Sequence, residues 1–356
     1  MCTAQGIGPG EHPAGRASRQ AMLIARSTLL LTAVVLLSIA ASDSAAVESP
    51  SSEVVVVSAT NSYEVKKSTH VYARGLVHEE WGDKKGTETD LLLDLYVPDG
   101  AEGPHPAAIL IHGGGFVGGS REFSVLSSMA ETLASRGWVC VSVDYRLAGD
   151  RGSVPERWSR YVDNQDAPLS IKQREQALAI YPASRDVKAA LRWLTAHAAA
   201  YSIDVSRVTA LGGSAGAILA VMLGATEPED YRDELSLADD PTLRSANLDA
   251  PSKVHTVVDF WGSAIAVQLY EDVWGQPRFG ESDAPLLIIH GTEDPTVSYE
   301  KALELEAIWQ SNDVPYELRT LVGAGHGAWN RTLDGLPLIE IAFDFIVRHQ
   351  QLLVVQ

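Results

Sequence analysis

Three residues that lie far apart in the sequence have the side chains of a nucleophile, a base and an acid. Ser214 lies in GGSAG, His326 in GAGHG and Asp294 in HGTEDPTV. A serine hydroxyl is a weak nucleophile at neutral pH, so it needs an imidazole base, and a carboxylate commonly holds that imidazole in the required tautomer. We therefore predict that these three residues act together in nucleophilic attack on a carbonyl carbon.

The glycines around Ser214 suit a sharp turn between a strand and a helix. The motif G-x-S-x-G is preceded by the apolar run RVTALG and followed by the helix-forming run AGAILAVMLGA. A serine on such a turn has a strained backbone, and glycine at positions 212 and 216 prevents side chains from colliding there. Small residues also allow a helix to pack closely on a strand, so the motif by itself is compatible with a purely structural role.

The base and the acid each follow an apolar run. His326 comes just after the last predicted strand, and Asp294 follows the strand APLLIIHG by a short turn. Glu293 and Asp259 are alternative acids, because the first neighbours Asp294 and the second lies in the preceding strand VVDFWG. The placement after a buried strand favours Asp294.

The sequence HGGGF, residues 112–116, follows another apolar strand and suits an oxyanion hole. Its glycines allow backbone N–H groups to approach a substrate oxygen without interference from side chains. We predict that the N–H groups of Gly114, Gly115 and Ala215 stabilise the negative oxygen of a tetrahedral intermediate. We expect His112 to brace this loop by hydrogen bonding.

Aromatic residues beside these motifs are candidates for the wall of a substrate pocket. They are Phe116, Trp261 and Trp329. Residues 149–180 are polar and aromatic and too long for an ordinary loop, so we predict a lid-like insertion near the mouth of the site. Trp158 and Tyr161 within this insertion either line the pocket or anchor the insertion to the body of the fold.

The chain as a whole reads as strands and helices in alternation. Continuous apolar runs such as HPAAILIHGGG are typical of strands that are buried on both faces, and FSVLSSMAETLASRG repeats apolar residues at helical spacing. This alternation predicts an α/β fold with a mostly parallel central sheet and helices on both faces. The chain order serine, acid, histidine, with each residue after a strand, is that of the α/β-hydrolase fold.

Five motifs together resemble those of a known family. HGGGF, VDYRLA, GGSAG, HGTEDPTV and GAGHG are similar to the motifs of α/β-hydrolase esterases of the hormone-sensitive-lipase-like group. Within that group they resemble the secreted bacterial feruloyl and acetyl-xylan esterases, and the resemblance runs from about residue 91 to the C-terminus. It implies hydrolysis of carboxylic esters, short-chain or aryl and carbohydrate-linked, through an acyl-enzyme on Ser214 and without a cofactor.

Two other functions remain as alternatives. A serine peptidase of the prolyl-oligopeptidase type shares the HGTED motif, but this chain lacks the length for a propeller domain. A non-catalytic binding protein on the same scaffold is a second alternative, because fold does not guarantee activity. A metal site is disfavoured, because no pair of histidines has ligand spacing on one helix and no set of cysteines exists.

The charge of the chain bears on its partners. With 46 acidic and 28 basic residues, the net charge is −18, which repels polyanions and argues against binding to nucleic acid. A small neutral ester, free or linked to a polysaccharide, fits this charge.

The N-terminal residues predict export. The apolar run LLLTAVVLLSIAA, residues 29–41, follows Arg19 and Arg26 and is too short for a membrane-spanning helix. We expect a signal peptide over residues 1–46, with a possible start at Met22, then a flexible linker over 47–60 and a single catalytic domain over 61–356. The expected location is secreted or periplasmic. Cys140, the cysteine outside the predicted signal peptide, lies in an apolar run and is expected to be a buried thiol.

Overall fold

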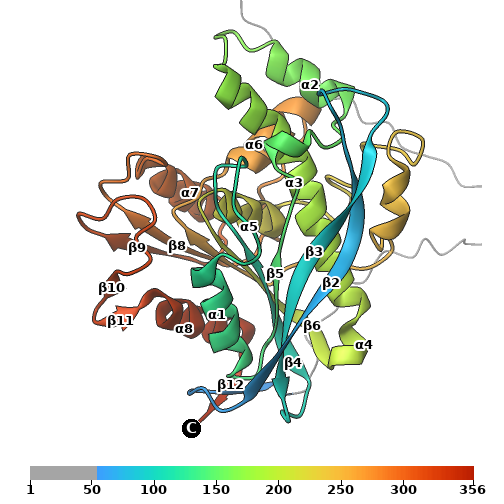
Figure 1. Cartoon of the computed structure of the whole chain (residues 1–356). Helices are drawn as coiled ribbons and strands as arrows, with labels where there is room; N and C mark the ends of the chain where they lie inside the picture. Colours follow the sequence, from blue (N-terminus) through green and yellow to red (C-terminus); the bar gives the residue numbers. More distant parts are fainter. Residues whose placement is uncertain (1–53) are drawn as a thin grey trace, which may run out of the picture. The chain divides into compact units, whose positions relative to one another are not determined.

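Eight strands form a central sheet in which all but the first two neighbouring pairs are parallel (Figure 1). The computed structural model describes residues 54–356. The strands, in their order across the sheet, are β2 (Glu64–Val77), β3 (Thr87–Asp99), β5 (Val139–Val143), β4 (His105–Ile111), β6 (Ile203–Gly213), β7 (Thr256–Phe260), β8 (Leu286–Gly291) and β9 (Tyr316–Leu321). The α/β fold with a mostly parallel sheet is therefore confirmed.

Helices cover both faces of the sheet, because the side chains of its central strands are apolar on both sides. In β4, Ile109 and Ile111 belong to one buried cluster, while Ala108 and Leu110 belong to the other. The second cluster contains α1 (Ser124–Ala134) and α8 (Leu338–Gln350). The first contains the other long helices: α2 (Glu156–Asp163), α3 (Ile171–Ala196), α5 (Ala215–Ala225), α6 (Ile265–Trp274) and α7 (Glu300–Ser311). A short helix, α4 (Ala198–Tyr201), follows α3.

The two ends of the described chain pair with each other. β1 (Val56–Ser58) runs parallel to β12 (Leu353–Val355), and the buried side chain of Val57 packs in the cluster of α1 and α8. The expectation of a flexible linker over 47–60 is thus wrong for residues 54–60. Residues 47–53 and the predicted signal peptide, residues 1–46, lie outside the described residues.

Three smaller findings complete the fold. β10 (Thr332–Leu333) and β11 (Leu336–Pro337) form a hairpin before α8. Cys140 is fully buried in β5, as expected, and burial raises the pKa of its thiol. Within residues 54–356, no helix combines the length and the apolar character needed to cross a bilayer.

The inserted residues 149–180 join directly onto the next helix. The helix that follows, α3, is 26 residues long and has Pro182 in its interior. Proline lacks an N–H donor, so the helix loses a hydrogen bond there. The indole N–H of Trp158 donates to the carbonyl of Ala177, five residues before the proline, at 3.0 Å. Because residues 178–195 are all buried, tertiary packing outweighs the local cost of the proline.

A buried ion pair fixes α3 to the sheet. The guanidinium and the backbone N–H of Arg146, just after β5, all donate to the carboxylate of Asp186 on α3, at 2.6 to 2.9 Å. The guanidinium also donates to the carbonyl of Leu76 in β2 at 3.0 Å. Both charged side chains are almost completely buried, at 4% and 3% exposure.

We expect Asp186→Ala to lower the free energy of unfolding by about 3–5 kcal/mol, because it leaves the charge of Arg146 buried without a partner. Urea denaturation followed by tryptophan fluorescence measures the change. Glu156→Ala is the control, since Glu156 pairs with Arg160 on the surface of α2 and such pairs contribute less than about 1 kcal/mol. Equal effects of the two substitutions would contradict a structural role for the buried pair.

Candidate active site

Ser214 occupies a strained turn between β6 and α5. Its φ and ψ angles are 55° and −122°, a conformation that non-glycine residues rarely adopt. A Cβ atom on Gly216 would overlap the carbonyl of Ile111 in β4, and one on Gly212 would overlap the backbone of Gly216. Glycine at these two positions therefore allows the start of α5 to lie against the sheet, with Ser214 at the turn.

The structure brings the three predicted residues together in one chain of hydrogen bonds. The Ser214 hydroxyl lies 3.0 Å from Nε2 of His326, and Nδ1 of His326 lies 2.7 Å from Oδ2 of Asp294. A carboxylate can only accept, so Nδ1 carries the proton and Nε2 faces the hydroxyl as an acceptor. This is the tautomer that a general base for Ser214 requires. The three residues follow β6, β8 and β9.

The surroundings of Asp294 favour its ionised form. Burial acts to raise the pKa of this carboxyl, but hydrogen bonds from His326 and from the N–H groups of Val297 and Thr296 outweigh burial and lower the pKa below its usual value. His290, which the sequence analysis did not assign, is fully buried and places Nε2 at 3.4 Å from Oδ2 of Asp294. Burial lowers the pKa of His290, and its Nε2 donates to the carbonyl of Val297 at 2.8 Å.

The predicted oxyanion residues lie next to Ser214. Gly115 and Ala215 line the same cavity as Ser214, and Gly114 precedes Gly115 in the loop after β4. Among the described residues, neither Gly114 nor Gly115 donates its N–H to a protein acceptor. The N–H of Ala215 lies in the first turn of α5, where helices leave donors free.

His112 braces this loop. Its Nδ1 donates to the carbonyl of Gly113 at 2.7 Å, and its ring stacks on Tyr145 at 4.2 Å. Burial lowers the pKa of His112, which keeps the imidazole neutral at pH 7. The expected hydrogen-bonding contact is therefore present, and it involves the loop rather than Ser214.

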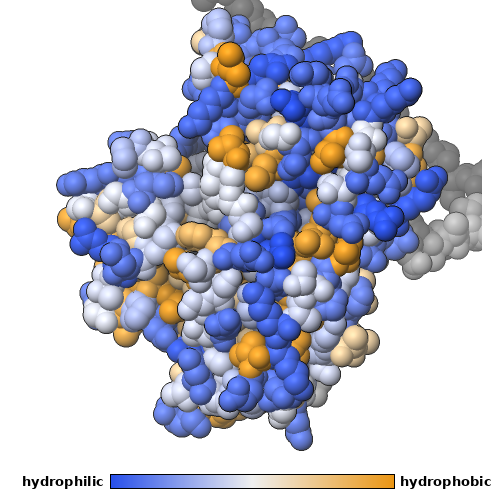
Figure 2. All heavy atoms as spheres, in the orientation of Figure 1, coloured by the Kyte–Doolittle hydropathy of each residue, from blue (hydrophilic) through white to orange (hydrophobic). Residues whose placement is uncertain are grey.

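A cavity of about 470 Å³ opens at Ser214. The inserted residues 149–180 supply one wall, made of Tyr161, Val162, Gln165, Leu169, Gln173, Gln176, Ala177 and Ile180. The opposite wall is mostly apolar and comes from α5, α6 and two loops: Phe116, Ile218, Ile265, Leu269, Thr296 and Val297. None of the lining residues carries a charge. The outer surface differs from this lining. Hydrophilic residues cover most of the upper part of Figure 2, which is the region of α2 in Figure 1.

The structure corrects the prediction that three aromatic residues form the wall of the substrate pocket. Phe116 lines the cavity, but Trp261 and Trp329 do not. Trp261 is buried and packs edge to face on Trp329, with ring centroids 4.4 Å apart, and Trp329 also packs on Phe260. These two tryptophans support the backbone around Gly213 and His326 instead of forming the wall.

The two aromatic residues of the insertion have different positions. Trp158 is fully buried and packs against Tyr181 and Tyr231, so it anchors the insertion. Tyr161 lines the cavity, and its hydroxyl donates to Asp272 at the end of α6 at 2.8 Å. The glutamines of the wall were not predicted, because only the folded position of α3 and of the segment before it brings them to the cavity of Ser214.

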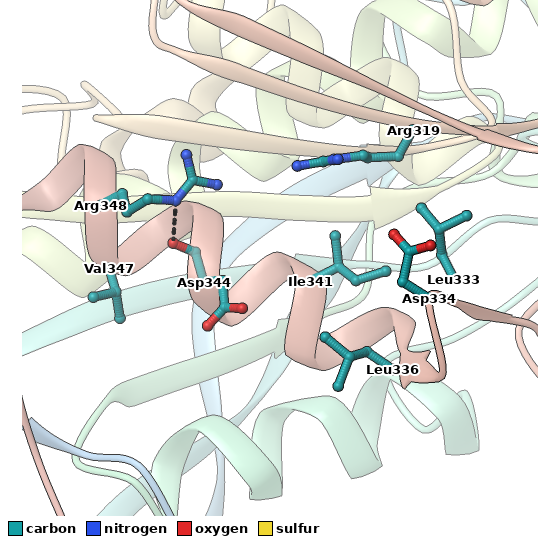
Figure 3. A pocket seen from close by; sticks show the side chains of 8 residues that line it. All are labelled: Arg319, Leu333, Asp334, Leu336, Ile341, Asp344, Val347 and Arg348. Atoms are coloured by element: carbon teal, nitrogen blue, oxygen red, sulfur yellow. Dashed lines mark hydrogen bonds between the residues drawn. The ribbon is translucent and has the colours of Figure 1, made fainter.

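A different pocket of similar size lies between β9, α8 and the β10–β11 hairpin (Figure 3). Apolar side chains such as Leu336 and Ile341 line it together with charged ones, including Arg319 and Asp344. It contains no serine, histidine or cysteine, so it offers no nucleophile. Within the residues that the structure describes, no group of three His, Cys, Asp or Glu side chains is arranged to hold a metal ion.

Comparison with known proteins agrees with this arrangement. Residues 93–156 and 149–278 match the BD-FAE family. The chain belongs to the BD-FAE family. Among curated relatives, Esterase LipC of Mycobacterium tuberculosis is 26% identical over 265 residues, which are 68% of this chain and 58% of LipC. The chain therefore spans little more than half the length of that relative.

Solved structures show the same fold for this member of the BD-FAE family. Thermogutta terrifontis esterase 2 phosphorylated by paraoxon aligns with a TM-score of 0.55 at 22% identity, covering 79% of this chain and 94% of that one. The butyrate-bound form of the same esterase aligns with a TM-score of 0.53 at 22% identity, covering 80% and 94%. The chain has the α/β-hydrolase fold.

The two alternative acids lie outside the hydrogen-bonded chain. The side chain of Glu293 is exposed, next to Asp294 in the same turn. Asp259 is fully buried in β7, where Oδ1 accepts from the N–H of Gly262 at 2.6 Å and Oδ2 has no partner among the described residues. Burial raises the pKa of Asp259 to about 7. The pKa of Asp259 in β7 is therefore raised, whereas the pKa of Asp294, which follows β8, is lowered.

We expect Asp259→Asn to stabilise the fold at pH 8 but not at pH 4. Between its usual pKa of 3.8 and about 7, Asp259 is ionised in the unfolded chain and protonated in the folded chain. The folded state then binds more protons, so wild-type stability falls by up to about 1.4 kcal/mol per pH unit, and the asparagine variant escapes this loss. Urea denaturation at pH 4, 6 and 8 measures the difference. A difference that does not grow with pH would contradict the raised pKa.

Proposed function

We propose that this chain is a serine carboxylic ester hydrolase that acts on short-chain or aryl and carbohydrate esters. The hydrogen-bonded series Ser214, His326 and Asp294, at an uncharged cavity beside N–H groups that have no acceptor within residues 54–356, carries this proposal. Ser214 is assigned as nucleophile, His326 as base and acid, and Asp294 as the residue that orients His326.

In the first half of the reaction, Oγ of Ser214 attacks the carbonyl carbon of the ester, and Nε2 of His326 takes the hydroxyl proton. The carbonyl oxygen becomes negative in the tetrahedral intermediate. The N–H groups of Gly114, Gly115 and Ala215 are assigned as the donors to that oxygen. When the intermediate collapses, the bond to the alcohol oxygen breaks and His326 returns the proton to the departing alcohol.

In the second half, water attacks the acyl-enzyme on Ser214 while His326 again takes a proton. The second intermediate collapses to the carboxylic acid, and His326 returns the proton to Oγ of Ser214. The ionised Asp294 stabilises the imidazolium that forms in each half-reaction. The lowered pKa of Asp294 keeps it ionised for this role at neutral pH.

The cavity favours a neutral substrate with both apolar and hydroxyl-bearing parts. Residues of α5 and α6, such as Ile218 and Leu269, offer apolar surface for an acyl chain or an aromatic ring. The amides of Gln165 and Gln173 offer donors and acceptors to hydroxyl groups on the opposite wall. Aryl and sugar esters combine these features, and membership of the BD-FAE family and similarity to Esterase LipC support ester hydrolysis.

A peptidase of the prolyl-oligopeptidase type remains the alternative, and the cavity argues only against an exopeptidase of that type. An exopeptidase binds the charged terminus of a peptide, and a buried charge needs a partner of opposite charge. The lining residues at Ser214 include none.

We expect purified protein to hydrolyse p-nitrophenyl acetate and butyrate, and Ser214→Ala to reduce kcat by a factor on the order of 10⁴ or more, because the nucleophile is lost. Asp294→Asn should reduce kcat by about 10⁴, since the imidazole is then free to adopt the wrong tautomer. Release of p-nitrophenol measures both. Asp259→Asn is the matched control and should retain activity, because Asp259 does not touch His326.

The substrate class is tested with a panel. Esters of increasing acyl length, methyl ferulate, acetylated xylan and a proline anilide are compared by kcat/KM. Cleavage of the anilide in preference to every ester would refute the esterase and favour the peptidase. A protein that neither hydrolyses an ester nor reacts with a fluorophosphonate probe at Ser214 would be a binding protein on this fold.

A further inference from the structure

We propose that Gln176 on α3 is a positioning residue that holds the oxyanion loop in its active conformation, so that the inserted segment is required for catalysis as well as for substrate binding. This inference rests on the proposed function. Its basis is one hydrogen bond, in which Nε2 of Gln176 donates to the carbonyl of Gly115 at 2.8 Å.

Each of three successive carbonyls in the loop has a separate donor. His112 Nδ1 donates to Gly113, the N–H of Val117 donates to Gly114, and Gln176 donates to Gly115. In a trans peptide the carbonyl and the following N–H point in opposite directions, so the first two bonds orient the N–H groups of Gly114 and Gly115, while the third orients the N–H of Phe116 and anchors Gly115 on its carbonyl side. The first two donors belong to the loop itself. The third comes from the insertion.

The peptide between Gly115 and Phe116 is the one that needs an external restraint. Both residues have a φ of 61°, which glycine tolerates but phenylalanine does not adopt without strain. A flip of this peptide by about 180° would bring Phe116 to a negative φ and relieve that strain. Gly115 would accommodate the matching change in ψ, because it has no side chain. The hydrogen bond from Gln176 opposes the flip.

The start of α3 is itself held firmly on both sides of Gln176. The indole N–H of Trp81, in the loop after β2, donates to the carboxylate of Glu175 at 2.8 Å. The indole N–H of Trp158 donates to the carbonyl of Ala177 at 3.0 Å. The residues on either side of Gln176 are thus hydrogen-bonded to two different parts of the protein. These bonds fix the helix backbone from which the Gln176 amide reaches Gly115.

A positioning role predicts a specific kinetic effect. Without the hydrogen bond from Gln176, Gly115 loses its anchor on the carbonyl side, and its N–H group moves away from the developing negative charge, which exists in the transition state but not in the bound ester. The loss therefore falls on kcat and is the same for different acyl groups. A direct contact between Gln176 and substrate would instead change KM, and by an amount that depends on the ester.

The test compares wild type with Gln176→Met, which keeps the length of the side chain but removes the donor. We expect kcat for p-nitrophenyl acetate and butyrate to fall about 10- to 100-fold, less than complete loss of an oxyanion donor, with KM changed by less than about threefold. The inhibition constant of an alkyl trifluoromethyl ketone, whose adduct with Ser214 carries an oxyanion, should rise by the factor by which kcat/KM falls. Lys172→Met, an exposed position one turn earlier on α3, is the control and should leave all these values unchanged.

Gln176→Glu gives a second, independent readout. Its ionised carboxylate cannot donate to Gly115, but a protonated carboxyl can, so its kcat relative to wild type should recover as the pH falls toward about 4. Unchanged kcat in both variants at pH 7, or a loss confined to KM that differs between acetate and butyrate, would overturn the inference. Wild-type protein without Ser214-dependent esterase activity would instead overturn the proposed function, and the inference with it.

Discussion

The close approach of α5 to the carboxyl ends of β4 and β6 is the contact on which the site depends. It is possible only because Gly216 and Gly212 lack side chains where the backbones of Ile111 and of the helix meet. This contact raises Ser214 on a strained turn and places the first N–H groups of α5 beside the loop that follows β4. Ser214, the proposed nucleophile, and the N–H groups proposed to stabilise its intermediate are thus brought to one place by backbone packing before any polar side chain contributes.

The parallel sheet supplies the other half of the arrangement. Because the carboxyl ends of parallel strands lie at one edge, residues that follow β6, β8 and β9 meet although they are distant in the chain. This is why Ser214, Asp294 and His326 could be identified from the sequence: each follows an apolar run that marks a buried strand. The central strands and most helices were predicted for the same reason, since their apolar patterns are local.

The cavity wall could not be predicted in the same way, because it depends on contacts between distant segments. Trp261 adjoins a strand end in sequence, yet its backbone has a φ of 47° and its ring lies in the core. Strand β2, which is not part of the cavity wall, was also not predicted. Its exposed face is rich in polar residues, so its sequence lacks the apolar run that identifies the central strands. The position of α3 over the cavity depends on Trp81 and on the buried pair of Arg146 and Asp186, which join segments far apart in the chain.

The distribution of charge suits both the binding of the substrate and the release of the product in the proposed reaction. The buried Arg146 and Asp186 are paired with each other, and the described residues that line the cavity carry no charge. In the proposed reaction a neutral ester enters without losing the hydration of an ion, and the proposed donors at Ser214 act in a medium of low dielectric constant. Hydrolysis converts this neutral ester into a carboxylate. The cavity has no cation to retain that anion, and the net charge of −18 on the chain repels it. The same absence of charge that admits the substrate therefore favours release of the acidic product.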